Sequence, residues 1–140
     1  MKKVLALDIG DAWTGIAISD ALGMFARPYT TVTTPELEAS LQNIIRQEPI
    51  ETVVVGYPKT MKGLESEQTI KTRKHQEKLA EIFPTISWIL WDERLSSKRA
   101  QGVQSQQKRK KDKSQKLQSH AIAAAFILDT YLKSQTPPVL

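Results

Sequence analysis

The pattern of hydrophobic and polar positions divides the chain near residue 34. Before it, short runs rich in small and β-branched residues predict three strands, at 3–8, 14–19 and 27–33. Gly10 and Asp11 lie between the first two runs and supply the chemistry of a hairpin turn. Three successive strands joined by short connections predict an antiparallel meander.

After residue 34 helical and extended patterns alternate. Thr34 and Pro35 predict a helix start, with a capping threonine and a proline in the first turn. Leu37, Leu41 and Ile44 then recur at helical spacing. The later segments predict a buried strand at 51–55, a loop at 59–64, a mostly solvated helix at 65–82 and a strand at 86–91. A short helix at 96–103, a polar loop or frayed helix end at 104–118 and an apolar final helix at 119–132 follow.

This order predicts an α/β fold with a mixed five-stranded sheet, three antiparallel strands first and helices on both faces. The final helix is too apolar to stand alone, so we expect the polar stretch before it to lie inside the domain. We therefore predict a single domain over residues 1–133, followed by a tail at 134–140.

Charge is distributed unevenly along the 140 residues. Residues 1–100 hold 13 basic and 13 acidic side chains, so the net charge of +5 lies wholly beyond residue 100. A uniformly basic protein is excluded, and a neutral body with a basic segment is indicated.

Several classes of protein do not fit the composition. Cysteine is absent, which excludes disulfides, thiol nucleophiles and cysteine-ligated metal sites. Only four apolar residues precede Asp8, too few for a signal peptide, and no run approaches the roughly 18 apolar residues of a membrane helix. We expect a cytoplasmic protein that does not contact membranes.

Acidic residues close two of the predicted buried strands. Asp8 ends the first strand, and Asp92 and Glu93 end the last. Alone, Asp8 is equally consistent with a turn cap, and Asp92 and Glu93 are more consistent with solvated charges, but together they suggest a site for a hard cation such as Mg²⁺. Because adjacent residues of a strand point to opposite faces, only one of Asp92 and Glu93 can share a site with Asp8.

Two histidines and a basic run complete the candidates. His120 is expected on the first turn of the final helix, as a capping or surface residue unless that turn faces the strand ends, and His75 on a solvated helix face. The basic run before His120 is either a solvated charge run or a contact for phosphate backbones. It comprises Lys108, Arg109, Lys110, Lys111, Lys113 and Lys116.

Four blocks of sequence, spanning nearly the whole chain, together resemble the YqgF (RuvX-like) family of pre-16S rRNA nucleases and Holliday-junction-resolvase-like proteins. These are LALDIGDAWTGIAISD (5–20), VVVGYPKTMKGLES (53–66), WDERLSSKRAQ (91–101) and HAIAAAFILDTYL (120–132). The resemblance implies an RNase H-like fold and a nuclease that depends on a divalent metal, Mg²⁺ or Mn²⁺.

The resemblance also implies roles for individual residues. Asp8 matches the first metal-binding acid and Glu93 the second, with Asp92 in support. His120 stands where the family commonly has aspartate, which implies weaker Mg²⁺ binding, a preference for Mn²⁺, a proton-carrying role or loss of catalysis. Lys59 and Arg94 lie in matching blocks and are expected to contact phosphates.

The implied function is phosphodiester hydrolysis at the 5′ end of pre-16S rRNA, in ribosome biogenesis. The alternatives are a non-catalytic nucleic-acid-binding protein, a Holliday junction resolvase acting on branched DNA, and an interaction scaffold on ribosomal particles. An ATP-handling relative of actin-like folds would need a much longer chain. The sequence does not determine whether the substrate is RNA or DNA, which metal is used, or what the oligomeric state is.

Overall fold

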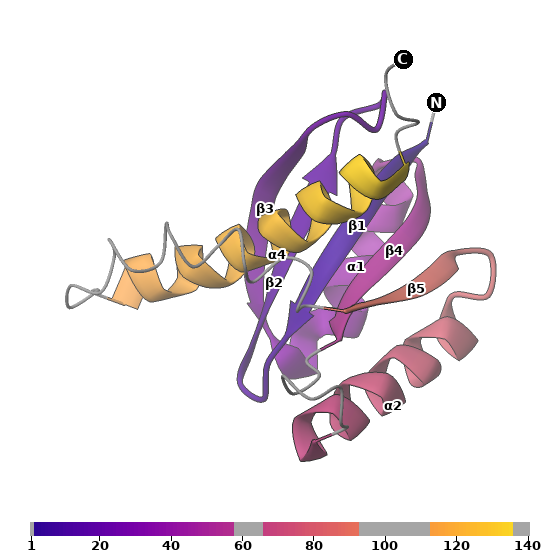
Figure 1. Ribbon diagram of the computed structural model, residues 1–140. Helices are drawn as coiled ribbons and strands as arrows, with labels where there is room; N and C mark the ends of the chain where they lie inside the picture. Colours follow the sequence, from indigo (N-terminus) through magenta and orange to yellow (C-terminus); the bar gives the residue numbers. More distant parts are fainter. Residues whose placement is uncertain (1, 58–65, 93–112, 136–140) are drawn as a thin grey trace.

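The computed structural model describes residues 2–57, 66–92 and 113–135, and the side chains of 113–117 are not described. The elements are β1 (Lys3–Ile9), β2 (Trp13–Ser19), β3 (Ala26–Thr33), the 3₁₀ turn η1 (Thr34–Glu36), α1 (Leu37–Gln47), β4 (Ile50–Tyr57), α2 (Glu67–Ile82), β5 (Ser87–Asp92) and α4 (Lys113–Gln135) (Figure 1). The predicted strands and their order are thereby confirmed.

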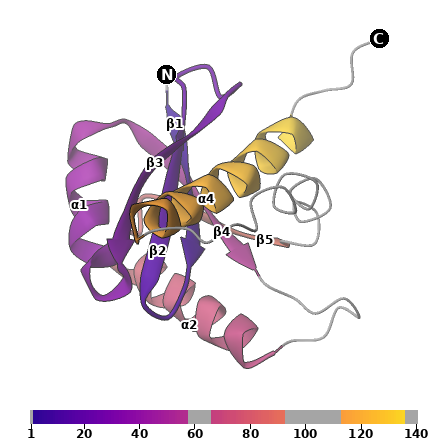
Figure 2. The same ribbon diagram turned by 90° about the vertical axis from the view of Figure 1, so that its left-hand side faces the viewer.

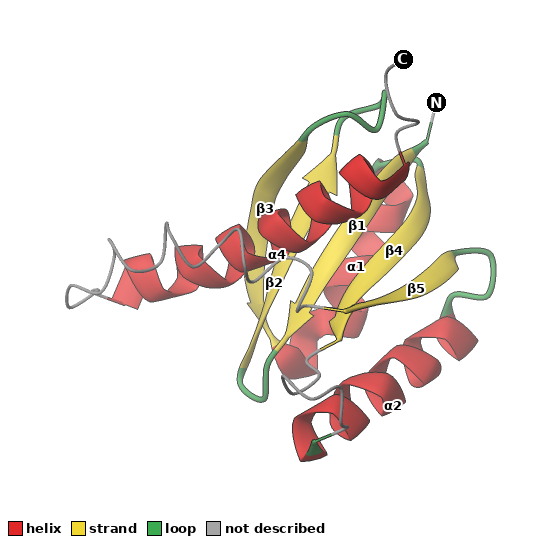
Figure 3. Ribbon diagram, in the orientation of Figure 1, coloured by secondary structure: helices red, strands yellow, loops and turns green. Residues whose placement is uncertain are grey.

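The strands form one sheet in the order β3-β2-β1-β4-β5 (Figure 3). β1 and β2 pair antiparallel, as do β2 and β3, whereas β1–β4 and β4–β5 are parallel pairs. This is the mixed sheet, begun by an antiparallel meander, that the hydrophobic pattern predicts.

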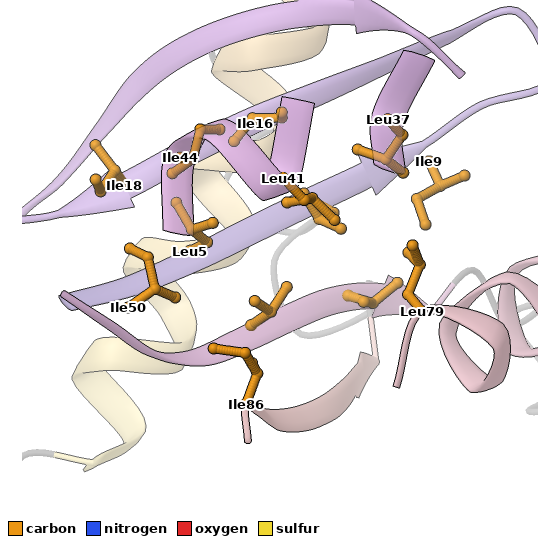
Figure 4. Close-up of a cluster of buried hydrophobic side chains, with 13 residues drawn as sticks. Leu5, Ile9, Ile16, Ile18, Leu37, Leu41, Ile44, Ile50, Leu79 and Ile86 are labelled. Carbon is orange, nitrogen blue, oxygen red and sulfur yellow. The ribbon is translucent and has the colours of Figure 1, made fainter. Parts of the chain in front are cut away.

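Helices cover both faces of the sheet. α4 crosses the front of the sheet in Figure 1, and α1 lies behind it. The core on the α1 and α2 side includes Leu5, Leu7, Leu41 and Leu79 (Figure 4). Ala6, Ala17, Val54, Ala124 and Leu128 form the core beneath α4. Odd and even residues of β1 thus serve different faces, as the alternation of a strand requires.

The final helix begins earlier than predicted. α4 starts at Lys113 rather than at residue 119. Of the two alternatives predicted for the polar stretch, a loop or a frayed helix end, residues 113–118 follow the helical one. The segment holds Lys, Gln, Leu and Ser but neither Gly nor Pro, and its lysines, glutamines and leucine are good helix formers. The predicted loop at 59–64 and the predicted helix at 96–103 lie outside the described residues.

Thr34 does not cap a helix, contrary to the prediction. It is the first residue of η1, and Thr33 occupies the cap position without a side-chain hydrogen bond. The Thr34 hydroxyl instead donates to the carbonyl oxygen of Gly10 at 2.6 Å. Since its one proton is used there, the buried Thr14 hydroxyl is the donor in the 2.9 Å bond between the two threonines. These bonds tie the β1–β2 turn to the start of α1.

No helix in the described part of the chain combines the length and the hydropathy needed to cross a membrane.

Candidate active site

Asp8 lies one residue before the end of β1, on the face that α4 covers. Ala6, two residues earlier, belongs to the core beneath α4, whereas Leu7 and Ile9 belong to the opposite core. Alternation along the strand therefore directs the half-buried Asp8 side chain toward the α4 side.

Gly15 is the direct neighbour of Asp8 on β2. A Cβ atom added at Gly15 would overlap the backbone carbonyl of His120 and lie 2.8 Å from the amide nitrogen of Ala121. The backbone of α4 therefore rests directly on the glycine. Because residues paired across antiparallel strands have Cα atoms about 4.5–5.5 Å apart, this contact places His120 beside Asp8.

His120 lies about two turns into α4, because the helix begins at Lys113. The expectation that it occupies the first turn is wrong for the same reason. His120 is half-buried and precedes the fully buried Ala124 by four residues, so it shares the sheet-facing side of the helix. The turn of α4 that carries His120 therefore lies against the end of β1 and the start of β2, at the pair Asp8 and Gly15.

Asp92 lies on the other face of the sheet from Asp8. Trp88 and Leu90 pack against the core of α1 and α2, and Trp91 packs against the core beneath α4. Alternation then assigns Asp92 to the α1 and α2 side. Of the two adjacent acids, Asp92 is not brought together with Asp8, and Glu93 lies outside the described residues.

Trp91 anchors the end of β5 to α4. Its indole Nε1 donates to the Thr130 hydroxyl at 3.1 Å, and its ring meets that of Tyr131 edge-on at 5.5 Å. Burial raises the pKa of the Tyr131 phenol, and the negative charge of Glu51 raises it further. The strand that leads to Glu93 is thus joined to the helix that carries His120.

The predicted phosphate contacts fall mostly outside the described residues. Lys59, Arg94 and the run from Lys108 to Lys111 are among the residues not described. Lys113 and Lys116 belong to the first turns of α4, seven and four residues before His120, and their side chains are not described.

The described residues do not by themselves complete the predicted metal site. Among them, no group of three His, Asp or Glu side chains could hold an ion. Asp8 offers carboxylate oxygens and His120 an imidazole nitrogen, and Mn²⁺ accepts both kinds of donor. This partial donor set fits the predicted metal.

Gly15 is the functional residue that sequence reasoning missed. It lies in the middle of the run TGIAIS, where a glycine weakens a strand unless another backbone approaches closely. A glycine inside a predicted strand therefore indicates that another backbone packs against it, but the sequence does not show which segment does so.

The fold resembles that of two solved RuvC structures. A structure described as "T. thermophilus RuvC in complex with Holliday junction substrate" matches with a TM-score of 0.59, at 15% identity, over 97% of this chain and 98% of that one. A second, "Thermus thermophilus RuvC structure", matches with a TM-score of 0.52 at 14% identity over 96% and 97% of the two chains. These likenesses show the RNase H-like, RuvC-like fold.

Sequence comparison shows the family. A protein of Rubrobacter xylanophilus named "Putative pre-16S rRNA nuclease" is 34% identical over 94% of this chain and 92% of its own length. A Staphylococcus epidermidis protein of the same name is 40% identical over 94% and 96% of the two chains. The family model described as "RuvX: Holliday junction resolvase" matches residues 2–134. The chain therefore belongs to the RuvX family.

Proposed function

We propose that this chain is a metal-dependent endonuclease that hydrolyses phosphodiester bonds at the 5′ end of pre-16S rRNA. The observation that supports the proposal is the contact of the α4 backbone at His120 with Gly15, the residue that pairs with Asp8 at the end of β1. The names of relatives more than 30% identical over most of both chains point to the same substrate. We place the reaction in the cytoplasm, on ribosomal particles or their precursor RNA.

Asp8 and Glu93 hold the divalent ion in this proposal, Mg²⁺ or Mn²⁺, and His120 completes its ligands. When bound, such an ion activates a water molecule and stabilises the leaving oxygen of the phosphodiester. Asp92 lies on the α1 and α2 side of the sheet, so the second carboxylate ligand in this proposal is Glu93. His120 has a second use here, since an imidazole can carry a proton near neutral pH.

The basic side chains of the chain hold the nucleic acid in this proposal. Lys59 and Arg94 contact phosphates near the reacting bond, and the run from Lys108 to Lys116 follows the backbone. Such contacts make binding dependent on salt and independent of base sequence.

Replacing Asp8 with Asn tests the proposal. The variant keeps the size of the side chain and removes its charge, so we expect the fold to remain and metal-dependent cleavage of a pre-16S rRNA fragment to vanish. Asp129→Asn is the matched control, because Asp129 lies on α4 and pairs with Lys133 at 2.9 Å, four residues away. The control should cleave like the wild type, and cleavage that survives in Asp8→Asn would refute the metal assignment.

A non-catalytic nucleic-acid-binding protein is the second candidate, and the histidine at position 120 favours it. Imidazole lacks the negative charge that a third carboxylate would bring to a metal ion. The discriminating variant is His120→Asp. If the wild-type chain binds RNA without cleaving it in Mg²⁺ or Mn²⁺, and His120→Asp cleaves, the binding protein is the correct assignment.

A Holliday junction resolvase is a third candidate, favoured by the fold shared with the RuvC structures. Parallel cleavage assays on a precursor RNA and on a four-way DNA junction separate the two substrates. Our proposal expects the RNA to be cleaved faster under the same metal conditions.

A further inference from the structure

A cavity opens at the end of β1 that carries Asp8, on the opposite side of the sheet from His120. It has a volume of about 370 Å³ and lies between the β1–β2 turn and one side of α2, with Ile9 and Gly10 in its wall. Figure 2 shows one end of α2 beside the lower ends of β1 and β2. The cavity therefore begins one residue beyond Asp8.

The α2 side of the cavity is mainly cationic. Lys71, Lys74 and His75 line it at helical spacing, together with the amide of Gln68. The acid on the facing wall is Asp11, which lies 3.8 Å from the Lys71 ammonium with both side chains mostly exposed. Such a long, solvated pair is weak, and Lys74 forms no ion pair with any described residue. The wall thus retains positive charge for an incoming anion.

A buried hydroxyl in the same wall belongs to Thr72. Thr72 is 1% exposed, and its Oγ1 has no hydrogen-bond partner among the described residues. Buried hydroxyls are normally hydrogen-bonded, and an unpaired one calls for an explanation. One explanation is that a ligand supplies the acceptor oxygen, and a negatively charged ligand also agrees with the positive charge of the surrounding lysines.

The position of the cavity suggests which anion enters it. Gly10 is two residues beyond Asp8, a distance of about 7 Å along an extended chain. In duplex DNA the charges of one strand recur about every 3.4 Å along the helix axis, so the backbone of a strand with one phosphate at Asp8 brings another phosphate within the span to Gly10. Phosphate oxygens accept hydrogen bonds from ammonium, amide and hydroxyl groups alike.

We propose that this cavity binds a backbone phosphate of the nucleic acid, one to three nucleotides from the bond beside Asp8. Lys71 and Lys74 neutralise its charge, and Gln68, His75 and Thr72 donate hydrogen bonds to its oxygens. The inference rests on the proposed nuclease function and adds a second point of contact, which sets the direction of the strand across the site.

The experiment measures binding of a fluorescein-labelled RNA hairpin as a function of KCl, without divalent metal. For Lys71→Gln/Lys74→Gln we expect weaker binding and a slope of log K against log[KCl] that is shallower by about 0.7–0.9 for the lost phosphate contact. Lys133→Gln removes one charge on α4, at an exposed residue far along the chain from the cavity, and should leave the slope unchanged. Thr72→Val should weaken binding with the slope kept and the melting temperature no lower.

Three results would overturn the inference. One is a wild-type slope in the double variant while the wild-type chain still cleaves RNA, which leaves the nuclease proposal intact. Another is an equal loss of slope in Lys133→Gln, which indicates a diffuse charge effect. The third is that inorganic phosphate binds the wild-type cavity while the double variant keeps its affinity for RNA. If the wild-type chain binds no RNA, both proposals fail.

Discussion

The backbone of His120 rests on Gly15, the residue that pairs with Asp8 across β1 and β2. The three residues come from the first strand, the second strand and the final helix. The distance between the carboxylate and the imidazole is therefore set by how closely α4 approaches the sheet. A side chain at residue 15 would change that distance.

Gly15→Ala tests this dependence. The added methyl group meets the His120 carbonyl, so α4 must move away from the sheet, at a cost of about 1–3 kcal/mol in unfolding free energy. We expect a lower melting temperature and a loss of cleavage that persists at temperatures where the variant remains folded. A variant with wild-type stability and activity would show that the close approach is not required.

Thr34→Val should loosen the turn that follows Asp8. The variant removes the bond to the Gly10 carbonyl and leaves the buried Thr14 hydroxyl without its acceptor, with an expected cost of about 1–3 kcal/mol. Thr34→Ser keeps the hydroxyl and is the control. Chemical denaturation of the three proteins measures the effect, and equal losses for Val and Ser would contradict the assigned bonds.

Most of the strands and helices can be predicted from the sequence, because they depend on local patterns of residues. Runs such as 14–19 are strands because their small and β-branched residues suit a sheet, and the spacing of Leu37, Leu41 and Ile44 forms the buried side of α1. The start of α4 is harder to predict, because the polar residues of 113–118 are compatible with a loop as well as with a helix end, although most of them favour a helix.

The candidate site depends on relationships between distant residues, which local patterns do not contain. Asp8 could be nominated from its strand end, but its partner across the sheet depends on register. Whether Asp92 or Glu93 shares the face of Asp8 depends on the phase of β5, which Trp91 reveals by packing beneath α4. The contact of Gly15 with His120 spans more than 100 residues of sequence.

Asp20 gives a pH-dependent prediction for the β2–β3 hairpin. Amide hydrogen bonds from Phe25 at 3.1 Å and Met24 at 2.8 Å hold the pKa of its carboxyl below the ordinary value of 3.8. The stabilising contribution is therefore fully present above that value and is lost as the pH falls through the lowered pKa. Asp20→Asn should lower the melting temperature at pH 7, with a difference that shrinks in acid. A pH-independent difference would assign the effect to something other than the charge.

Trp91→Phe should cost about 0.5–1.5 kcal/mol through the lost indole hydrogen bond to Thr130. The Thr130 hydroxyl keeps backbone acceptors at Phe126 and Ile127, so no buried group is left unpaired. Trp91→Ala also removes the ring that packs on Tyr131 and should cost about 3–5 kcal/mol. Urea denaturation distinguishes the two, and equal losses would mean that the hydrogen bond, not the packing, holds β5 to α4.

A crystal structure of the protein soaked in Mn²⁺, with anomalous diffraction to locate the ion, tests the central claim most directly. Our account predicts an ion between Asp8, Glu93 and His120, and no ion in Asp8→Asn treated in the same way. An empty site in the wild-type crystal, or side chains of these three residues too far apart to share an ion, would contradict it.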